Sequence, residues 1–392
     1  MGQDLAGVSF VIPCLNEAAT LPIVLEKINR VRKNELSDRS TEIVVADNGS
    51  TDESERIALD HGARVVHCAD RGYGSALQGG IAAASHDVVV FADADDTYDF
   101  LEAPHLVAEL ERGFDLVLGS RLDGNIHPGA MPWLHRRVGT PVLNLLINVL
   151  HARNGNRVAD CNSGFRCFRA AAFSSWQVTG RGMEFASEML LKALKSGARI
   201  SHVPISLHPD HAGRTPHLRT WRDGTRHLLQ ILLEAPHFFH GSGLLLWGIC
   251  WAVMLAASRL GTVSLGFAEV LGLHSMMFAM LGSCFGLTLW STGLLLSVRS
   301  TAQQRSYRAV LGLGEGALFW GATAFAVLSL AFFAVIVRRW AQAGFENLAL
   351  ERQTLLLTAF GANGILFVFN VITAHLLKQM AERPPAGPLQ SR

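Results

Sequence analysis

The stretch Asp87-Val88-Val89-Val90-Phe91-Ala92-Asp93-Ala94-Asp95 joins a continuous apolar run to two carboxylates placed directly after it. A continuous run of β-branched and aromatic residues is typical of a strand buried on both faces of a sheet. Two neighbouring carboxylates at the end of such a strand repel each other, so both stay ionised only beside a cation. Mg²⁺ and Mn²⁺ take oxygen ligands and commonly share them with substrate phosphates. The stretch therefore predicts a divalent-metal site with Asp93 and Asp95 as ligands.

Short apolar runs alternate with helical patterns in the first part of the chain. Strands are expected at Val8–Ile12, Glu42–Ala46, Arg64–Val66, Asp87–Ala92 and Asp115–Leu118, with helices at Ala18–Val31 and Ser75–Ala84. Farther along, helices are expected at Val138–Leu150 and Met183–Leu194 and a strand at Ile200–Pro204. Strands that alternate with helices form βαβ units, so the expected fold class is α/β, with a mainly parallel sheet covered on both faces.

Polar residues follow four of the expected strands, the first of which should stop at Pro13. They are Asn16 and Glu17, Asp47 and Asn48, Asp93 to Asp96, and Gly119 to Arg121. Ligands of such sheets bind at the carboxyl ends of the strands, so these side chains are expected to meet at one edge. Asn16 also suits a helix N-cap and Asp47 a turn, and both structural roles are compatible with ligand binding.

The segment Arg71-Gly72-Tyr73-Gly74-Ser75-Ala76 superficially matches a dinucleotide-binding glycine loop. It follows the third strand rather than the first, and the third glycine is out of place, which argues against NAD. We expect instead a tight glycine turn at which Gly74 lets a nucleotide approach the backbone.

The mean hydropathy of the whole chain is +0.25, and the apolar residues concentrate in its second part. Four nearly uncharged segments have bilayer-spanning length, namely Leu244–Leu265, Leu271–Val298, Ala317–Val337 and Leu355–Leu377. Ahead of them, apolar residues and arginines lie on separate faces of an expected helix, as in amphipathic interface helices. The expected domains are a catalytic domain at 1–215, interface helices at 216–240, four membrane helices at 241–378 and a disordered tail at 379–392.

Charge and cysteine usage narrow the function class. Acidic residues are in excess in residues 1–240 and basic residues in the remainder, which argues against nucleic-acid binding and fits loops at an anionic membrane. The six cysteines form no CxxC pair, which indicates reduced, structural thiols. Residues 1–7 lack the basic start and apolar core of a signal peptide. We therefore expect a multi-pass protein of the cytoplasmic membrane with its catalytic domain in the cytosol.

Several motifs occur together in the order seen in family 2 glycosyltransferases of the GT-A fold. They are Pro13-x-x-Asn16-Glu17, Val45 to Asp52, Ala92-Asp93-Ala94-Asp95, and Gly119-Ser120-Arg121. With Asp160 to Phe168 and Met183 to Glu188, they resemble the dolichol-phosphate mannose and polyprenyl-phosphate glucose synthase group. The resemblance covers about residues 8–235, and the four-span tail is similar to that of members with four membrane helices.

This resemblance implies a role for each matching position. Nucleotide binding would fall to Pro13, Asn16, Glu17, Asp47, Asn48, Gly74, Asp93 and, from a mobile loop, Arg214. Asp93 and Asp95 would hold Mg²⁺ or Mn²⁺ and would form the catalytic set together with Arg121. The acceptor phosphate would meet Arg121, Arg136 and Arg137, and the sugar and acceptor pocket would contain Ser163, Gly164, Phe165 and Glu184. Arginine forks suit phosphate oxygens, although Arg137 could equally be interfacial charge.

Three positions depart from the pattern of that group. Asn48 replaces a common acidic residue, Tyr73 a basic residue of the glycine turn, and Thr97 a glutamine that follows the two aspartates. The third protein ligand of the metal is therefore open, with Asp96, Asp99 or water as candidates.

Residues and resemblance together predict a membrane-bound hexosyltransferase. It would move mannose or glucose, from GDP-mannose or UDP-glucose, to a dolichyl or undecaprenyl phosphate with inversion, and a homo-oligomer is compatible with this role. A processive polysaccharide synthase is the first alternative, although its Gln-x-x-Arg-Trp motif is absent. A non-catalytic nucleotide-binding membrane scaffold would lose the Asp93–Asp95 pair, and a transporter would need more polar residues in its spans. The sequence does not choose the sugar or the base.

Overall fold

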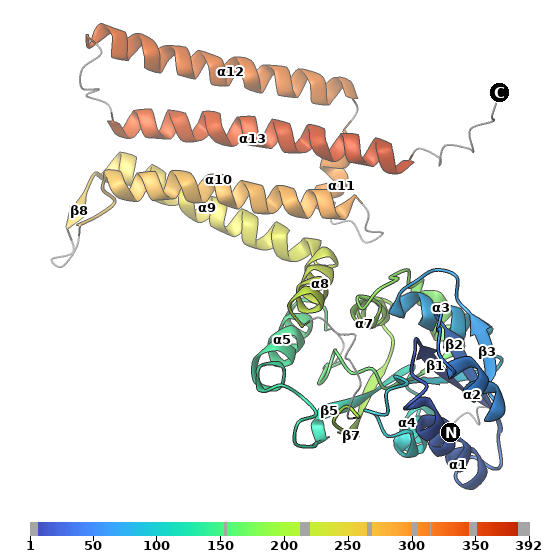
Figure 1. Cartoon of the computed structure of the whole chain (residues 1–392). Helices are drawn as coiled ribbons and strands as arrows, with labels where there is room; N and C mark the ends of the chain where they lie inside the picture. The colour runs from blue at the N-terminus through green and yellow to red at the C-terminus, as the bar shows by residue number, and fades with distance from the viewer. Residues whose placement is uncertain are drawn as a thin grey trace, which may run out of the picture. The chain divides into compact units, whose positions relative to one another are not determined.

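The computed structural model describes residues 7–152, 155–211, 220–264, 269–298, 305–313, 315–344 and 351–382. The chain divides into two units, Met1–Leu232 and Leu233–Arg392 (Figure 1). The first unit contains a seven-stranded sheet with helices on both faces, and the second contains long apolar helices with a two-stranded ribbon.

The sheet has the strand order β3-β2-β1-β4-β6-β5-β7. Its strands are β1 (Gly7–Cys14), β2 (Ser40–Asp47), β3 (Arg64–His67), β4 (Val88–Phe91), β5 (Leu116–Ile126), β6 (Arg166–Arg169) and β7 (Ile200–Leu207). All neighbouring pairs are parallel except those of β6, which runs antiparallel to both β4 and β5. Because β6 reverses direction against both neighbours, β4 and β5 point the same way. The carboxyl ends of β1, β2, β4 and β5 therefore share one edge.

The helices of this unit fill the connections. They are α1 (Leu21–Asn34), α2 (Ser54–Asp60), α3 (Tyr73–Ala83), the 3-10 turn η1 (Phe100–Glu102), α4 (Ala103–Glu111), the π-helical turn η2 (His135–Gly139), α5 (Thr140–Leu150), α6 (Ala170–Trp176), α7 (Phe185–Lys195) and α8 (Thr220–Leu233).

One face of the sheet is covered by α1 and α4. Val8, Phe10 and Ile12 of β1 point to this face and belong to one buried cluster with residues of both helices. The contributions of α1 have the helical spacing seen in the sequence, namely Leu21, Val24, Leu25, Ile28 and Val31. Burying such a side chain fully contributes about 1.5–3 kcal/mol, so this face anchors the strands whose ends form the site.

The opposite face is covered by α3 and α7. Val11 and Phe91 point this way because successive strand residues alternate between faces. The ring of Phe91 lies 6.3 Å from that of Phe185 in α7. Gly80 brings α3 close to β1, since a Cβ at Gly80 would lie 2.5 Å from Val11 Cγ1. The sheet is thus buried on both faces, as the apolar runs predict.

Three features of the sheet differ from the sequence prediction. β1 does not stop at Pro13 but runs to Cys14, whose carbonyl accepts from Asn48 N at 2.9 Å on the β2 side. The backbone polar groups of adjacent strand residues point to opposite neighbouring strands, so the backbone of Pro13 points toward β4. The pairing of β1 with β4 has already ended at Val11, so the missing N–H of Pro13 breaks no strand hydrogen bond. β5 continues to Ile126 by pairing with β7, so Gly119 to Arg121 lie inside a strand rather than after it. Strand β6 was not predicted, because its four residues gain their strand partners only from β4 and β5.

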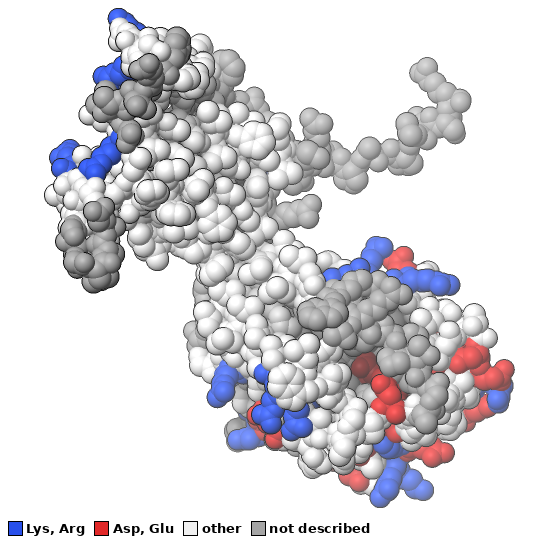
Figure 2. Space-filling view, turned by 60° about the vertical axis from the view of Figure 1, so that its left-hand side comes forward, with Lys and Arg blue, Asp and Glu red and all other residues white. Residues whose placement is uncertain are grey.

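The described part of the second unit contains four helices that are long and apolar enough to cross a membrane. Its elements are α9 (Pro236–Leu260), β8 (Val263–Ser264), β9 (Glu269–Val270), α10 (Leu273–Ser297), α11 (Arg305–Leu311), α12 (Glu315–Gln342) and α13 (Glu351–Glu382). On the face shown in Figure 2, the helix flanks carry uncharged residues and basic side chains appear at one end. The four helices predicted from the sequence are therefore present. The expected interface segment is shorter, because Pro236 begins α9 instead of continuing α8.

Polar and small side chains join these helices. Gly243 of α9 and Gly286 of α10 face each other, and a Cβ on Gly243 would lie 2.7 Å from Gly286 O. Asn363 of α13 accepts a hydrogen bond from Trp247 Nε1 at 3.0 Å and donates to Ser283 Oγ at 2.9 Å. Close glycine contacts and interhelical hydrogen bonds are the usual means of association where the surroundings are apolar.

Candidate active site

Asp93 and Asp95 begin the loop that follows β4, at the edge where the parallel strands end. Asp95 accepts hydrogen bonds at Oδ1 from Thr97 N (3.1 Å) and Thr97 Oγ (2.7 Å), so Thr97 fixes the loop. Gly164 lies beside Asp93, since a Cβ there would come 2.9 Å from Asp93 Oδ2. A side chain at position 164 would therefore collide with the Asp93 carboxylate, and glycine avoids this collision.

Asp96 is tied to the protein rather than turned toward a ligand. It has a left-handed φ of 61°, which an aspartate tolerates better than most residues. Its Oδ1 lies 2.8 Å from Lys27 Nζ and its Oδ2 lies 3.1 Å from His211 Nε2. Asp99 accepts from Leu101 N at 3.1 Å and lies 3.4 Å from Lys27 Nζ. Neither candidate for a third metal ligand is thus placed beside Asp93 and Asp95 by an observed contact.

A metal site formed by protein groups alone is not found in the described residues, where no three His, Cys, Asp or Glu side chains gather suitably. Two carboxylates suffice for Mg²⁺ or Mn²⁺ when substrate phosphates and water complete the shell. The carboxylate oxygens of Asp93 and Asp95, which follow β4 at the edge where the parallel strands end, fit such an ion.

The ends of β1 and β2 are bound to each other. Asn16, at a left-handed φ of 57°, donates through its backbone N–H to Ser50 Oγ at 3.0 Å and accepts from Thr51 N at 2.8 Å. Asp47 accepts from the backbone N–H groups of Gly49 and Ser50, each at 3.1 Å. Burial raises the pKa of Asp47, but these hydrogen bonds outweigh it and hold the pKa below its usual value. The turn role of Asp47 is therefore observed, and its role in base binding stays a prediction.

Glu17 is buried at the same edge. Its backbone N–H donates to Ser54 Oγ at 3.0 Å, and its carboxylate accepts from Thr20 Oγ at 3.1 Å. These contacts fix the start of α1 against α2. Binding of ribose by Glu17, and of the base by Pro13, remain predictions.

Asn48 and the glycine turn serve packing. The Asn48 side chain donates to the Asp70 carbonyl at 2.8 Å and accepts from Gly72 N at 2.7 Å. A Cβ at Gly74 would come 2.2 Å from the Gly180 carbonyl, and one at Gly72 equally close to the Arg181 carbonyl. Glycine at these two positions therefore allows the backbone of the segment before α7 to pack directly against the turn. Binding of a nucleotide at Gly74 stays a prediction.

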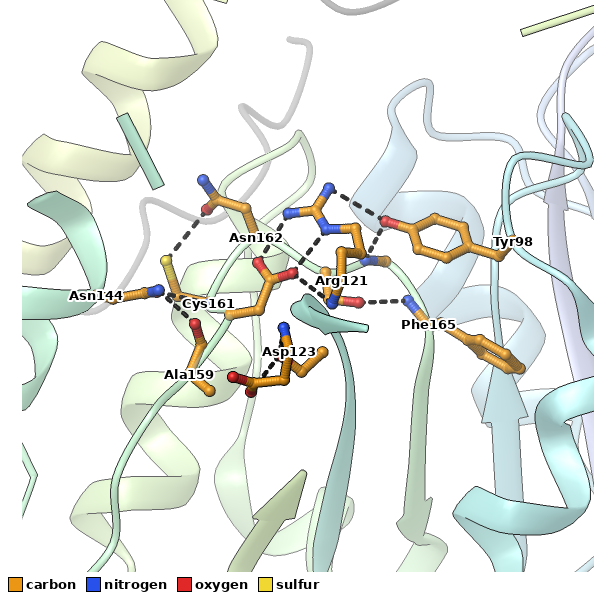
Figure 3. Close-up of polar contacts among 12 residues, drawn as sticks. Tyr98, Arg121, Asp123, Asn144, Ala159, Cys161, Asn162 and Phe165 are labelled. Atoms are coloured by element: carbon orange, nitrogen blue, oxygen red, sulfur yellow. Dashed lines mark hydrogen bonds and ion pairs between the residues drawn. The ribbon is translucent and has the colours of Figure 1, made fainter. Parts of the chain in front are cut away.

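Arg121 forms a buried ion pair that the sequence did not predict. Its Nε donates to Asp160 Oδ2 at 2.7 Å and its Nη2 to Asp160 Oδ1 at 2.8 Å, while its backbone N–H also bonds Asp160. Burial lowers the pKa of a guanidinium, but Tyr98 and Asp160 outweigh this and raise the pKa of Arg121. Figure 3 shows the guanidinium extended toward the Tyr98 hydroxyl, 3.4 Å away. Arg121 is thus a fixed cation within β5, at the point where its pairing with β7 is interrupted.

The loop that carries Asp160 is held from α5. Asn144 donates to the Ala159 carbonyl and accepts from Cys161 N at 2.9 Å (Figure 3). Farther along, the fully buried Arg166 donates to the carbonyls of Ser163 (3.0 Å) and Cys161 (3.0 Å). These bonds to backbone fix both ends of the loop. The predicted pocket residues Ser163 and Gly164 lie in it.

The other predicted residues lie in different surroundings. The ring of Phe165 packs 6.0 Å from that of Tyr98, inside the buried cluster, and Glu184 accepts from Gly182 N at 2.8 Å. Arg136 and Arg137 are exposed on η2. Arg214 lies outside the described residues. No role was assigned from the sequence to Tyr98, Asp160 or Lys27. Asp160 begins a stretch that carries the family resemblance and Tyr98 lies five positions after Asp93, whereas Lys27 had no nearby sequence signal.

The chain is similar in sequence to known glycosyltransferases. The model of the family described as glycosyl transferase family 2 matches residues 9–175. The low-salt glycan biosynthesis hexosyltransferase Agl6 of Haloferax volcanii is 33% identical over 379 residues, which cover 92% of this chain and 86% of the relative. The chain belongs to glycosyl transferase family 2.

Two further similarities concern this glycosyltransferase. The dolichyl-phosphate hexose transferase of Haloferax volcanii is 31% identical over 213 residues, 54% of this chain and 86% of the relative. The solved structure of glucosyl-3-phosphoglycerate synthase from Mycobacterium tuberculosis matches with a TM-score of 0.47 and 24% identity, covering 59% of this chain and 80% of the other. The predicted family, the α/β class with its mainly parallel sheet, and the apolar helical tail are confirmed.

Proposed function

We propose that this family 2 glycosyltransferase is a membrane-bound hexosyltransferase that transfers glucose or mannose from a nucleotide diphosphate sugar to a polyprenyl phosphate. The observation that carries the proposal is the link from Arg121 through the Tyr98 hydroxyl to Gly164, which lies beside Asp93, in a chain whose described part contains four long apolar helices. Carboxylates suit a metal-bound diphosphate, and a fixed guanidinium suits an acceptor phosphate. The names of the two Haloferax relatives, a hexosyltransferase and a dolichyl-phosphate hexose transferase, support the same class.

The proposed reaction is an in-line displacement. An oxygen of the acceptor phosphate attacks the anomeric carbon as the bond from that carbon to the nucleoside diphosphate breaks, so an α-linked donor gives a β-linked product. A phosphate monoester has its second pKa at about 6 and needs no strong general base at neutral pH. Arg121 holds the attacking group, and the loop of Asp93 and Asp95 holds the leaving group. Mg²⁺ or Mn²⁺, when bound there, neutralises the developing charge of the diphosphate.

The first unit also has a surface suited to a lipid acceptor. Along η2 and α5, the apolar side chains that are exposed lie on one helical face, namely Leu134, Val138, Val142, Leu145 and Val149. Exposed Arg136 and Arg137 adjoin this face. An apolar helical face beside arginines suits an anionic bilayer surface, where a polyprenyl phosphate resides. Arg305 and Arg308 after the second span favour a catalytic domain on the cytosolic side, whereas Arg338 and Arg339 at the other end of the spans oppose this orientation.

The change Asp95→Asn tests the proposal. In membranes given a panel of radiolabelled nucleotide sugars, the wild type should form a labelled lipid that disappears with EDTA, and the variant should form none. Asp60→Asn makes the same chemical change at an exposed position of α2 and should keep full activity. Binding of Mn²⁺ in the presence of a nucleoside diphosphate, followed by electron paramagnetic resonance, should be weakened in Asp95→Asn only. Full transfer by Asp95→Asn would refute the role of Asp95 in holding the metal and the leaving group. Labelled polysaccharide instead of labelled lipid would favour a processive synthase.

A further inference from the structure

Tyr98 is buried between the two halves of the proposed site. It is 4% exposed, and its hydroxyl oxygen accepts from Gly164 N at 2.8 Å and from Arg121 Nη1 at 3.4 Å. A Cβ at Gly164 would lie 2.9 Å from Asp93 Oδ2 and 3.3 Å from the Tyr98 hydroxyl. The phenol thus lies beside both the carboxylate assigned to the donor and the guanidinium assigned to the acceptor.

The hydroxyl proton of Tyr98 has no acceptor among the described residues. The oxygen accepts in both of these contacts, and the hydroxyl makes no further hydrogen bond to the described part of the chain. A tyrosine phenol has an ordinary pKa of about 10. The group therefore stays protonated at neutral pH. A buried O–H donor without an acceptor is costly, so a ligand oxygen is its natural partner.

Arg121 supplies two more donors at the same place. A guanidinium has five N–H groups. Asp160 takes one from Nε and one from Nη2, and Tyr98 takes one from Nη1. One N–H on Nη1 and one on Nη2 remain without an acceptor in the described residues. Two guanidinium N–H groups and one phenol O–H together match the several oxygens of a phosphate group.

We propose that the Tyr98 hydroxyl donates a hydrogen bond to a non-attacking oxygen of the acceptor phosphate, beside the Arg121 guanidinium. This inference rests on the proposed function. Tyr98 is then a substrate-binding residue that keeps the acceptor next to the donor, because its ring is fixed by Phe165 and its oxygen by Gly164. Holding two reactants in attacking geometry is a main source of rate in such transfers.

The test uses the full chain in detergent with Tyr98→Phe and, as a matched control, Tyr307→Phe. Tyr307 is also buried, but its hydroxyl contacts the Trp290 carbonyl in the second unit. We expect Tyr98→Phe to raise the KM for polyprenyl phosphate about tenfold, a typical loss for one hydrogen bond to a charged group. The KM for the nucleotide sugar should stay the same, and Tyr307→Phe should change neither constant. An unchanged lipid KM, or equal increases in both constants, would overturn the inference.

A binding experiment separates this inference from the proposed function. Farnesyl phosphate, followed by ³¹P resonance, should bind more weakly to Tyr98→Phe than to the wild type. Farnesol, which lacks phosphorus and is followed by proton resonance, should bind to both proteins alike. If the wild type transfers no sugar to lipid, the proposed function fails while this measurement still decides the role of Tyr98. Equal affinity of both proteins for farnesyl phosphate would exclude a phosphate contact.

Discussion

Replacing Asp160 by asparagine should destabilise the catalytic unit strongly. Asp160 is fully buried and the Arg121 side chain is 12% exposed, so solvent screens the pair little. The amide keeps one oxygen for the backbone N–H of Arg121 but loses the charge and turns an N–H₂ toward the guanidinium. Leaving one charge of a buried pair uncompensated costs about 3–5 kcal/mol. For a domain of this size each kcal/mol lowers Tm by about 2–4 °C, so a fall of roughly 6–20 °C is expected.

The double variant Arg121→Met with Asp160→Asn tests the cause. It removes both charges and keeps an oxygen for the backbone N–H of residue 121. Because neutral replacement of a buried pair is often tolerated, stability should return to within about 1–2 kcal/mol of the wild type. Transfer should still be lost, since the acceptor cation is gone.

The assay is thermal unfolding of the full chain in detergent by tryptophan fluorescence. Alkylation of Cys161, which is fully buried beside Asp160, reports on the catalytic unit alone when read by mass spectrometry during heating. A Tm of Asp160→Asn within about 3 °C of the wild type would refute the reasoning, as that is below the smallest cost expected for a buried pair. So would a double variant no more stable than the weaker single variant.

Two further predictions concern Gly164 and Glu42. Gly164→Ala places a Cβ 2.9 Å from Asp93 Oδ2. The variant should bind Mn²⁺ about tenfold more weakly in the presence of a nucleoside diphosphate, with Tm nearly unchanged. Unaltered metal affinity would show that Asp93 can shift without cost. Burial opposes ionisation of Glu42, but hydrogen bonds from Arg64, Ser9 and Ser85 outweigh it and lower its pKa from 4.5 to about 2. Since the folded pKa is the lower one, this stabilisation is present above pH 4.5 and is lost as the pH falls toward about 2. Thermal unfolding of Glu42→Gln should therefore show a smaller loss of Tm over this pH interval than the wild type, and equal losses would contradict the assignment.

The local sequence was sufficient for much of the fold. Val88 to Phe91 are apolar without interruption, and Val8 to Ile12 are interrupted only by Ser9; a strand between two helical layers buries every residue of such short runs. The spacing of Leu21, Leu25 and Ile28 likewise defines α1 and its buried face. These patterns depend on neighbours in the chain, so they can be recognised without knowing what lies opposite.

Elements that depend on distant partners were not predictable in this way. β6 has four residues and becomes a strand because β4 and β5 flank it on both sides. β5 extends past Leu118 because β7, about eighty residues later, pairs with it. Gly72 and Gly74 have the spacing of a ligand loop, yet the carbonyls of Gly180 and Arg181 occupy the space that they leave.

The sequence by itself determined the family, the parallel strand ends and the carboxylates Asp93 and Asp95, because these follow from local periodicity and residue chemistry. Only the tertiary structure decided how the surrounding charges are paired. Arg121 is fixed by Asp160, 39 positions away, and Asp96 by Lys27 and His211, 69 and 115 positions away. The free energy of a buried charge depends on which groups the fold brings within about 3 Å of it, and that distance is not encoded in any local pattern.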